Sequence, residues 1–177
     1  EAGADVHRTN GFGLTALGCA VAAQLPARVN DLIARGVAVD PPDDRSVRPF
    51  LIAVDVGDAE IARLLLAAGA RIDQPMAYRG TALHMAAATN DVPMVQVLLD
   101  AGADVRATNQ YGTTPLMTAA GNGARECAQL LLDRGAQINA VDAYGHSAIA
   151  RAIQRGQLDM LDFLADPVNG AGWLRYG

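Results

Sequence analysis

Three histidines and two cysteines are the side chains of this sequence best suited to acid–base, nucleophilic or metal chemistry. A histidine serves as a general base or a metal ligand when other polar groups are held beside it. His7, His84 and His146 lie far apart in the sequence, and no HExxH, GxSxG or CxxC pattern accompanies them. Cys19 and Cys127 show no metal-ligand spacing, so we expect two buried, reduced thiols. These residues predict no catalytic site and no metal site.

Acidic pairs and one glycine-rich stretch are weaker candidates for binding a cation or a phosphate. Asp43–Asp44 and Asp58–Glu60 could hold a cation. However, Asp43 stands in a predicted turn, and Asp58 stands where it would cap a predicted helix. The stretch GNGAR, residues 121–125, is interpreted as the turn between two helices. We therefore expect neither an enzyme nor a cofactor.

The composition predicts a globular chain with a core of small aliphatic side chains. Of the 177 residues, 51% are hydrophobic and 5% aromatic, which favours closely packed helices. The net charge is −5, and all 14 basic residues are arginines, a bias typical of a GC-rich, bacterial genome. An acidic chain without a basic run predicts no nucleic-acid partner. No apolar run is long enough for a membrane helix, so we expect no membrane insertion.

A period of 33 residues organises nearly the whole chain without gap or insertion. One position, at a predicted helix start, is occupied by Thr15, Arg48, Thr81, Thr114 and Ser147. A second position, in a predicted longer helix, is occupied by Leu32, Leu65, Leu98, Leu131 and Leu164. Such self-similarity is typical of repeat architectures, in which each unit buries its apolar face against its neighbours.

Residues 108–140 show how one unit is built. Asn109 favours a turn, Thr114 caps a short helix, and Pro115 suits its first position. The glycines of 121–123 end that helix, and a second helix follows through CAQLLLDRG. Helices this short are unstable alone, so the units must stack.

Several segments match one family. TTPLMTAA, GTALHMAAA and QLLLDRGAQINA resemble the ankyrin repeat, and the resemblance covers residues 1 to about 166. It implies an all-α repeat solenoid, with a helix-turn-helix and a β-hairpin or turn in every 33 residues. The segment RPFL at 48–51 departs from the motif, and only His84 stands at the motif's histidine position. We therefore expect the inter-helix hydrogen bonds of that histidine to be weak in the other repeats.

The expected organisation is five repeats with a segment at each end. Residues 1–8 are interpreted as the tail of an upstream repeat. Residues 167–177 are interpreted as a C-terminal tail or cap, in which Trp173 and Tyr176 fold back over the last helix; a mobile, ligand-like segment is the alternative. The repeats occupy residues 9–166, divided into 9–41, 42–74, 75–107, 108–140 and 141–166.

A row of large side chains recurs at one turn position of the repeat. It consists of Phe12, Arg45, Tyr78, Tyr111 and Tyr144. In the ankyrin family this position lies at the tips of the hairpin fingers, beside a concave groove. Aromatic residues and arginine are enriched in binding hot spots. Two compatible interpretations stay open: the rings of successive fingers pack on one another, or the row contacts a partner.

The resemblance also places residues on the floor of the groove. Towards the N-terminal end the expected contact residues are apolar: Leu14, Val47 and Val56. Towards the C-terminal end they are polar: Asn122, His146 and Arg155. An exposed apolar patch usually indicates an interface. A groove graded from apolar to polar suits an amphipathic helix or a loop of another protein.

These features predict a non-enzymatic protein–protein interaction module whose partner is another protein of unknown identity. One alternative is a bacterial inhibitor or immunity-type protein that occludes a toxin or enzyme. Another is the regulatory domain of a larger protein. We expect a cytoplasmic monomer, with a periplasmic or exported location as the alternative if a signal precedes Glu1.

Overall fold

The computed structural model describes residues 9–11, 13–40, 47–74 and 80–165. The chain divides into two compact units, unit 1 (Glu1–Ile72) and unit 2 (Asp73–Gly177). The expected repeat tail at the N-terminal end and the expected C-terminal tail or cap lie outside the described residues.

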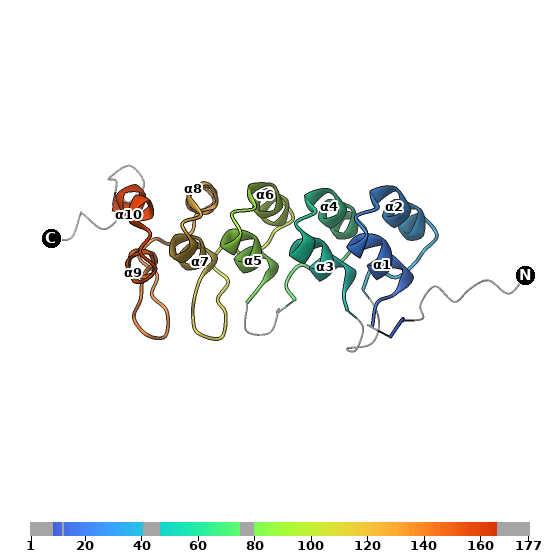
Figure 1. Cartoon of the computed structure of the whole chain (residues 1–177), viewed down its shortest axis with the longest axis horizontal. Helices are drawn as coiled ribbons and strands as arrows, with labels where there is room; N and C mark the ends of the chain where they lie inside the picture. The colour runs from blue at the N-terminus through green and yellow to red at the C-terminus, as the bar shows by residue number, and fades with distance from the viewer. Residues whose placement is uncertain (1–8, 12, 41–46, 75–79, 166–177) are drawn as a thin grey trace, which may run out of the picture. The chain divides into compact units, whose positions relative to one another are not determined.

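The described residues form ten helices and no β-strand (Figure 1). Unit 1 contains α1 (Ala16–Ala22), α2 (Pro26–Ala34), α3 (Pro49–Val56) and α4 (Ala59–Ala67). Unit 2 contains α5 (Ala82–Ala88), α6 (Val92–Asp100), α7 (Pro115–Asn122), α8 (Arg125–Asp133), α9 (Ala148–Gln154) and α10 (Leu158–Ala165). The helices come in antiparallel pairs, a shorter first helix and a second helix, as the resemblance implied.

Local sequence signals set the ends of these helices. The Thr114 hydroxyl accepts a hydrogen bond from the Met117 N–H at the start of α7, and Pro115 occupies the first turn. Asp58 and Asp91 cap α4 and α6 in the same way, as expected of an aspartate at that place. The end of α7 differs slightly from the expectation. The helix continues through Gly121, and only Gly123 ends it, with a φ of 71°.

The first helices pack side by side within each unit because their facing residues are small. In unit 2, α5 packs against α7 and α7 against α9, while α6 packs against α8 in a second layer (Figure 1). Ala86, Ala119 and Ala152 recur at this contact and are buried. Leu98 and Leu131, from the second helices, are fully buried between the layers. Truncating one such leucine to alanine costs about 2–5 kcal/mol, so the core depends on the stacked pairs.

Unit 1 follows the same plan on its own. There α1 packs against α3 and α2 against α4. Phe50, Leu65 and Ile61 are fully buried, so the unusual RPFL segment still supplies a core aromatic. The Asp40 carboxylate accepts a hydrogen bond from the Arg71 backbone N–H at 3.0 Å, which ties the end of one pair to the end of the next.

A left-handed residue separates the two helices of each pair, and one of these residues also links neighbouring pairs. The position is occupied by Gln24, Gly57, Asn90, Gly123 and Gly156. The Asn90 amide oxygen accepts from the Cys127 N–H at 3.2 Å, and its nitrogen donates to Glu126 at 2.7 Å. Since α8 has no side-chain cap of its own, Asn90 caps it from the preceding pair.

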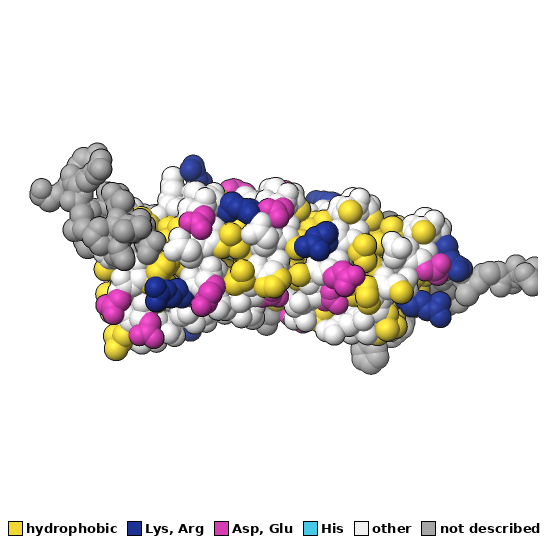
Figure 2. All heavy atoms as spheres, turned by 90° about the horizontal axis from the view of Figure 1, so that it is seen from above, with side chains coloured by type: hydrophobic (Ala, Val, Ile, Leu, Met, Phe, Trp, Pro, Cys, Tyr) yellow, Lys and Arg dark blue, Asp and Glu magenta, His cyan; other side chains and the backbone are white. Residues whose placement is uncertain are grey.

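On the face seen in Figure 2, Arg and acidic side chains are scattered among hydrophobic and uncharged ones. Exposed pairs such as Arg35–Asp31 and Arg134–Asp100 contribute little to stability. Cys127 is buried, and its pKa is raised to about 11. The main cause is burial of the thiol, and the negative charges of Asp91 and Glu126 add to it. The expectation was wrong for Cys19, which is exposed on α1. No helix in the described ranges is long and apolar enough to cross a bilayer.

Candidate partner-binding surface

His84 links two neighbouring helix pairs in unit 2. Its Nδ1 lies 3.2 Å from the Thr81 N–H and accepts from it, while Nε2 donates to the Thr113 carbonyl at 2.8 Å. The ring therefore acts in its neutral form with the proton on Nε2. Burial lowers the His84 pKa, against a smaller upward effect of the Thr113 hydrogen bond. Gly80 lies against the ring, where an added Cβ would be 2.9 Å away.

The same histidine position is filled by other residues elsewhere in the chain. In the next repeat it is Met117, whose sulfur accepts from the Thr114 N–H at 3.4 Å. In the last it is Ala150, which has no polar side chain. This hydrogen bond between repeats is therefore rare, as expected. Among His84, Met117 and Ala150 of unit 2, only His84 ties its repeat to the next finger.

The loops that join one helix pair to the next are here called fingers; of the expected β-hairpin or turn, the described residues form the turn. Two backbone hydrogen bonds close the tip at Tyr111: the Asn109 N–H donates to the Thr113 carbonyl, and the Gly112 N–H donates to the Asn109 carbonyl. The Asn109 side chain accepts from the N–H groups of Tyr111 and Thr113. Asp142 makes the same two bonds, to Tyr144 and His146. A strand ladder does not form because the side chain takes over these donors.

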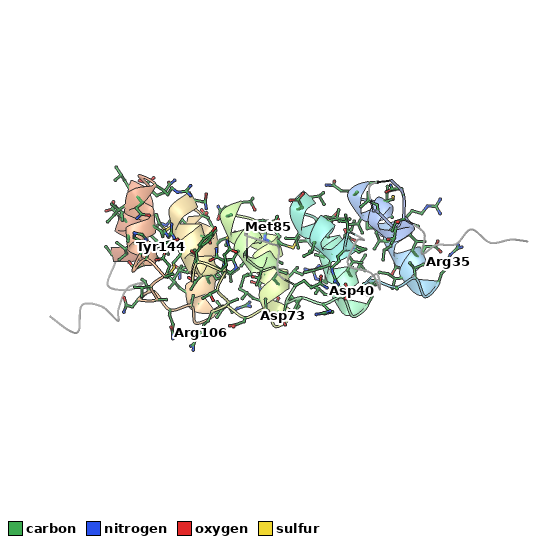
Figure 3. All side chains as sticks on the ribbon, turned by 90° about the horizontal axis from the view of Figure 1, so that it is seen from below. Arg35, Asp40, Asp73, Met85, Arg106 and Tyr144 are labelled. Carbon is green, nitrogen blue, oxygen red and sulfur yellow. The ribbon has the colours of Figure 1, made fainter. Side chains whose placement is uncertain are left out.

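The fingers hold two tyrosines of the predicted row in exposed positions. Tyr111 is 42% exposed and Tyr144 is 66% exposed. Figure 3 views the molecule from the finger side, with Arg106 and Tyr144 labelled on successive connections. The Tyr144 ring contacts His146 with centroids 6.2 Å apart, and within the described residues it makes no ring contact with Tyr111. Phe12, Arg45 and Tyr78 lie outside the described residues.

Adjacent fingers in unit 2 touch through their backbones. The Tyr111 carbonyl accepts from the Ala143 N–H at 2.9 Å. Gly112 makes this approach possible because a Cβ there would lie 3.0 Å from the Ala143 nitrogen. The tip of each finger is therefore fixed by its own side chain and by the next finger.

A cleft of about 220 Å³ lies between the finger at Tyr111 and helices α7 and α9. It brings together three of the predicted contact residues, Tyr111, Asn122 and Arg155. The remaining lining residues are Asn109, Thr113, Met117, Thr118, Gly121 and Arg151. The predicted residues His146 and Tyr144 do not line it, although their finger is the next one along the chain.

A buried ion pair closes one end of this cleft. The Asp142 side chain is fully buried and pairs with the Arg151 guanidinium, which also donates to the Thr113 hydroxyl at 3.4 Å. Removal from water raises the Asp142 pKa, but hydrogen bonds from the His146 and Tyr144 N–H groups, with the charge of Arg151, lower it to about 2. The His146 Nδ1 lies 3.4 Å from the same carboxylate.

Unit 1 carries the predicted apolar contact residues. Val47 is 41% exposed and Val56 36% exposed, while Leu14 is half-buried. Leu14 and Ile52 approach each other over Gly18, where a Cβ would lie 3.5 Å from a methyl carbon of each. Unit 1 thus exposes apolar side chains at predicted contact positions, whereas the cleft of unit 2 is lined mainly by polar residues.

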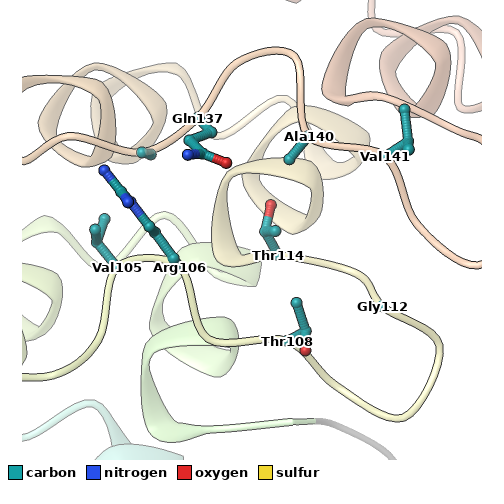
Figure 4. Close-up of a pocket in the computed structure, with 9 residues that line it drawn as sticks. Val105, Arg106, Thr108, Gly112, Thr114, Gln137, Ala140 and Val141 are labelled. Carbon is teal, nitrogen blue, oxygen red and sulfur yellow. The ribbon is translucent and has the colours of Figure 1, made fainter.

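A second hollow in unit 2, of about 120 Å³, lies between the bases of two successive fingers (Figure 4). Figure 4 shows Arg106 and Gln137 on one side of it and Thr114 on the helix start. Its volume suits a few water molecules rather than a ligand. No group of three or more His, Cys, Asp or Glu side chains able to hold a metal ion occurs in the described part of the chain.

Residues 83–172 match the family model of ankyrin repeats, in three copies. This match covers half of the chain, counted as 90 of 177 residues. The chain belongs to the ankyrin repeat family. Ankyrin repeats typically mediate protein–protein interactions and are typically non-enzymatic. No curated protein matches the sequence.

Within this ankyrin chain, sequence reasoning missed two functional neighbours of the predicted row, Arg151 and the buried carboxylate of Asp142. Asp142 was assigned only to a turn. Arg151 stands where the other repeats carry Cys19, Ile52, Met85 and Thr118. An arginine at a position otherwise free of charge was the signal that could have pointed to the ion pair.

Proposed function

We propose that this ankyrin chain is a non-enzymatic binding module that captures another protein on its groove and fingertips. One observation carries the proposal. Tyr111 has its backbone fixed by Asn109 and by the next finger, yet its ring stays 42% exposed at the edge of a cleft. A preorganised aromatic side chain loses little conformational entropy on binding, which is why tyrosine is common in binding hot spots.

The apolar surface of unit 1 supports the same function. Val47 and Val56 expose branched side chains without a partner that covers them in the described structure. Exposed apolar side chains clustered on one face are typical of an interface. A stable complex would bury on the order of 800 Å² on this chain.

The proposal is tested by removing both described tyrosine rings. The double variant Tyr111→Ala, Tyr144→Ala should lose capture of the native partner from a host lysate, with the captured protein identified by mass spectrometry. Its melting temperature should stay near that of the parent because both rings are largely exposed. Leu158→Ala is the matched control, since it removes an equally exposed apolar side chain from α10.

Two results would contradict the proposal. If melting collapses while the refolded variant still captures the partner, the tyrosines are structural. If Leu158→Ala weakens capture as much as the double variant does, binding does not use the fingertips.

A further inference from the structure

The cleft of unit 2 carries a charge opposite to that of the chain. Its lining residues include Arg151 and Arg155 and no acidic residue, whereas the chain has a net charge of −5. A local reversal of this kind focuses the field on the cleft and favours an anionic group there.

Arg155 is free to bind such a group. The residue is exposed, and its guanidinium makes no hydrogen bond or ion pair within the part of the chain that the structure describes. Its stem lies over Gly121, where an added Cβ would be 3.6 Å from Arg155 Cγ. The arginine stem thus lies against α7, and Arg155 lines the cleft.

The Asp142 carboxylate, which pairs with Arg151, does not neutralise Arg155. Asp142 is fully buried, and its oxygens are taken by two backbone N–H groups and by Arg151. Arg151 itself keeps a buried Nε without a hydrogen-bond partner. The positive charge of the cleft is therefore compensated only at its inner end.

Polar and aromatic groups complete the lining. Tyr111 offers an exposed ring, and Thr118 and Asn122 offer polar groups on α7. The Asn122 side-chain nitrogen already donates to the Thr118 carbonyl at 2.8 Å, which fixes the amide. A planar carboxylate fits the guanidinium fork, and the methylene groups behind it fit the tyrosine ring.

From these features we propose that the cleft takes a glutamate or aspartate side chain of the partner protein, so that the partner presents an acidic segment to this end of the chain. The inference rests on the proposed function and names the chemistry of its partner. A protein segment is favoured over a nucleic acid because a chain with a net charge of −5 would repel a continuous phosphate backbone more than a single carboxylate.

The test is a nuclear magnetic resonance titration of the isotope-labelled full chain with two blocked peptides, acetyl-Gly-Leu-Glu-Leu-Gly-amide and its Gln counterpart. The Glu peptide should shift the backbone amides of Gly121, Asn122 and Arg155. Arg155→Gln should weaken its binding about tenfold, the loss expected for a charge-assisted hydrogen bond. Arg134→Gln, an equal change of charge on α8, should leave the binding unchanged.

Four results would overturn the inference. They are equal shifts with the Gln peptide, no shift at millimolar Glu peptide, equal loss of binding in Arg134→Gln, and tighter binding of an oligothymidylate that also depends on Arg155. The last would assign the cleft to nucleic acid. If the inference fails while the tyrosine double variant still loses its captured partner, the proposed function stands and only the acidic chemistry is wrong.

Discussion

His84 is a buried imidazole that is useful only while it is neutral. Its Nδ1 must accept from Thr81, and a proton placed there would leave a buried charge facing a donor. Because the His84 pKa is lowered in the folded chain, the folded and unfolded chains bind its proton at different pH values. The unfolded chain binds a proton near the ordinary histidine pKa of about 6.5, and the folded chain does so only at lower pH. The contribution of His84 to stability is therefore complete above about pH 6.5 and is lost as the pH falls.

The residue-scale prediction concerns His84→Gln. At about pH 7.5 the variant should lose about 1–3 kcal/mol of unfolding free energy, because the Thr81 N–H or the Thr113 carbonyl loses its partner. On acidification the parent should lose stability faster than the variant. Urea unfolding followed by circular dichroism at several pH values measures both effects. A constant difference between the two proteins at every pH would show that His84 does not titrate with folding.

Besides the His84 imidazole, the Asp142 carboxyl group makes stability depend on pH, in a separate pH range. The Asp142 pKa is lowered to about 2, so its ion pair with Arg151 contributes stability above the ordinary aspartate pKa and loses it as the pH approaches 2. The two groups titrate in different ranges, and the comparison of parent with His84→Gln therefore reports on His84 alone above about pH 5.

Single residues were predicted well where a local rule decides their role. Thr114 and Asp58 cap helices because their own neighbours supply the donors. The pair Asp142–Arg151 and the position of Gly121 under Arg155 were not predictable in the same way. They depend on how a finger and a helix approach in space, which a sequence period does not state. Cys19 was wrongly expected to be buried for the same reason.

At the scale of elements, the fingers of unit 2 are held by contact as well as by turn chemistry. Gly112 and Gly145 occupy the same place in successive fingers and share a positive φ, of 73° and 79°. Only Gly112 lies against the next finger: a Cβ added there would be 3.0 Å from the Ala143 nitrogen. Nothing lies within 4 Å at Gly145.

This pair of glycines gives the element-scale prediction. Gly145→Ala should cost about 1 kcal/mol, the strain of alanine in a left-handed conformation. Gly112→Ala should cost about 1–3 kcal/mol more, because the Cβ would push the backbone of Ala143 away. Chemical denaturation of both variants measures the difference. Equal costs would mean that the Tyr111–Ala143 backbone contact does not hold the fingers together.

The helices were predicted more fully than the connections between them. The caps and glycines are local, and the second helices lie where their repeated leucines place them. The fingers were expected as a β-hairpin or a turn, and in the described residues they are turns, in which the side chains of Asn109 and Asp142 accept from N–H groups of the tip.

At the scale of the whole molecule, the net charge falls to zero near pH 5. The sequence has a pI of about 5.0 and a formal charge of −5 at pH 7. Proteins near zero net charge lose the mutual repulsion that keeps them apart. The composition, rather than the fold, therefore sets how the chain behaves in solution.

We predict least solubility near pH 5, with clear solutions at about pH 7.5. Light scattering across this range measures it. The variant His84→Gln is the control, because it removes the histidine titration and leaves the charge at pH 7 unchanged. If scattering at the low pH disappears in the variant, partial unfolding rather than charge neutrality causes the association.

The period of 33 residues was the strongest signal for the molecule as a whole, and the family match over 83–172 agrees with it. A repeat is visible in one sequence because each unit must bury the same face against its neighbours. The partner is not visible, because the surface that meets it lies outside that constraint. The cleft of unit 2 shows this division, with buried alanines behind it and unrepeated arginines in front.

Gly121 lowers the stability of α7 and lies against the arginines that line the cleft. Inside a helix a glycine is less stable than an alanine by about 1 kcal/mol. A Cβ at this place would still be in ordinary contact with Arg155 and Arg151, at 3.6 Å and 3.8 Å. Alanine would fit, whereas a longer side chain would press on the stems of Arg155 and Arg151. Position 121 is thus a point at which evolution or a protein engineer could alter what the cleft accepts without changing either arginine.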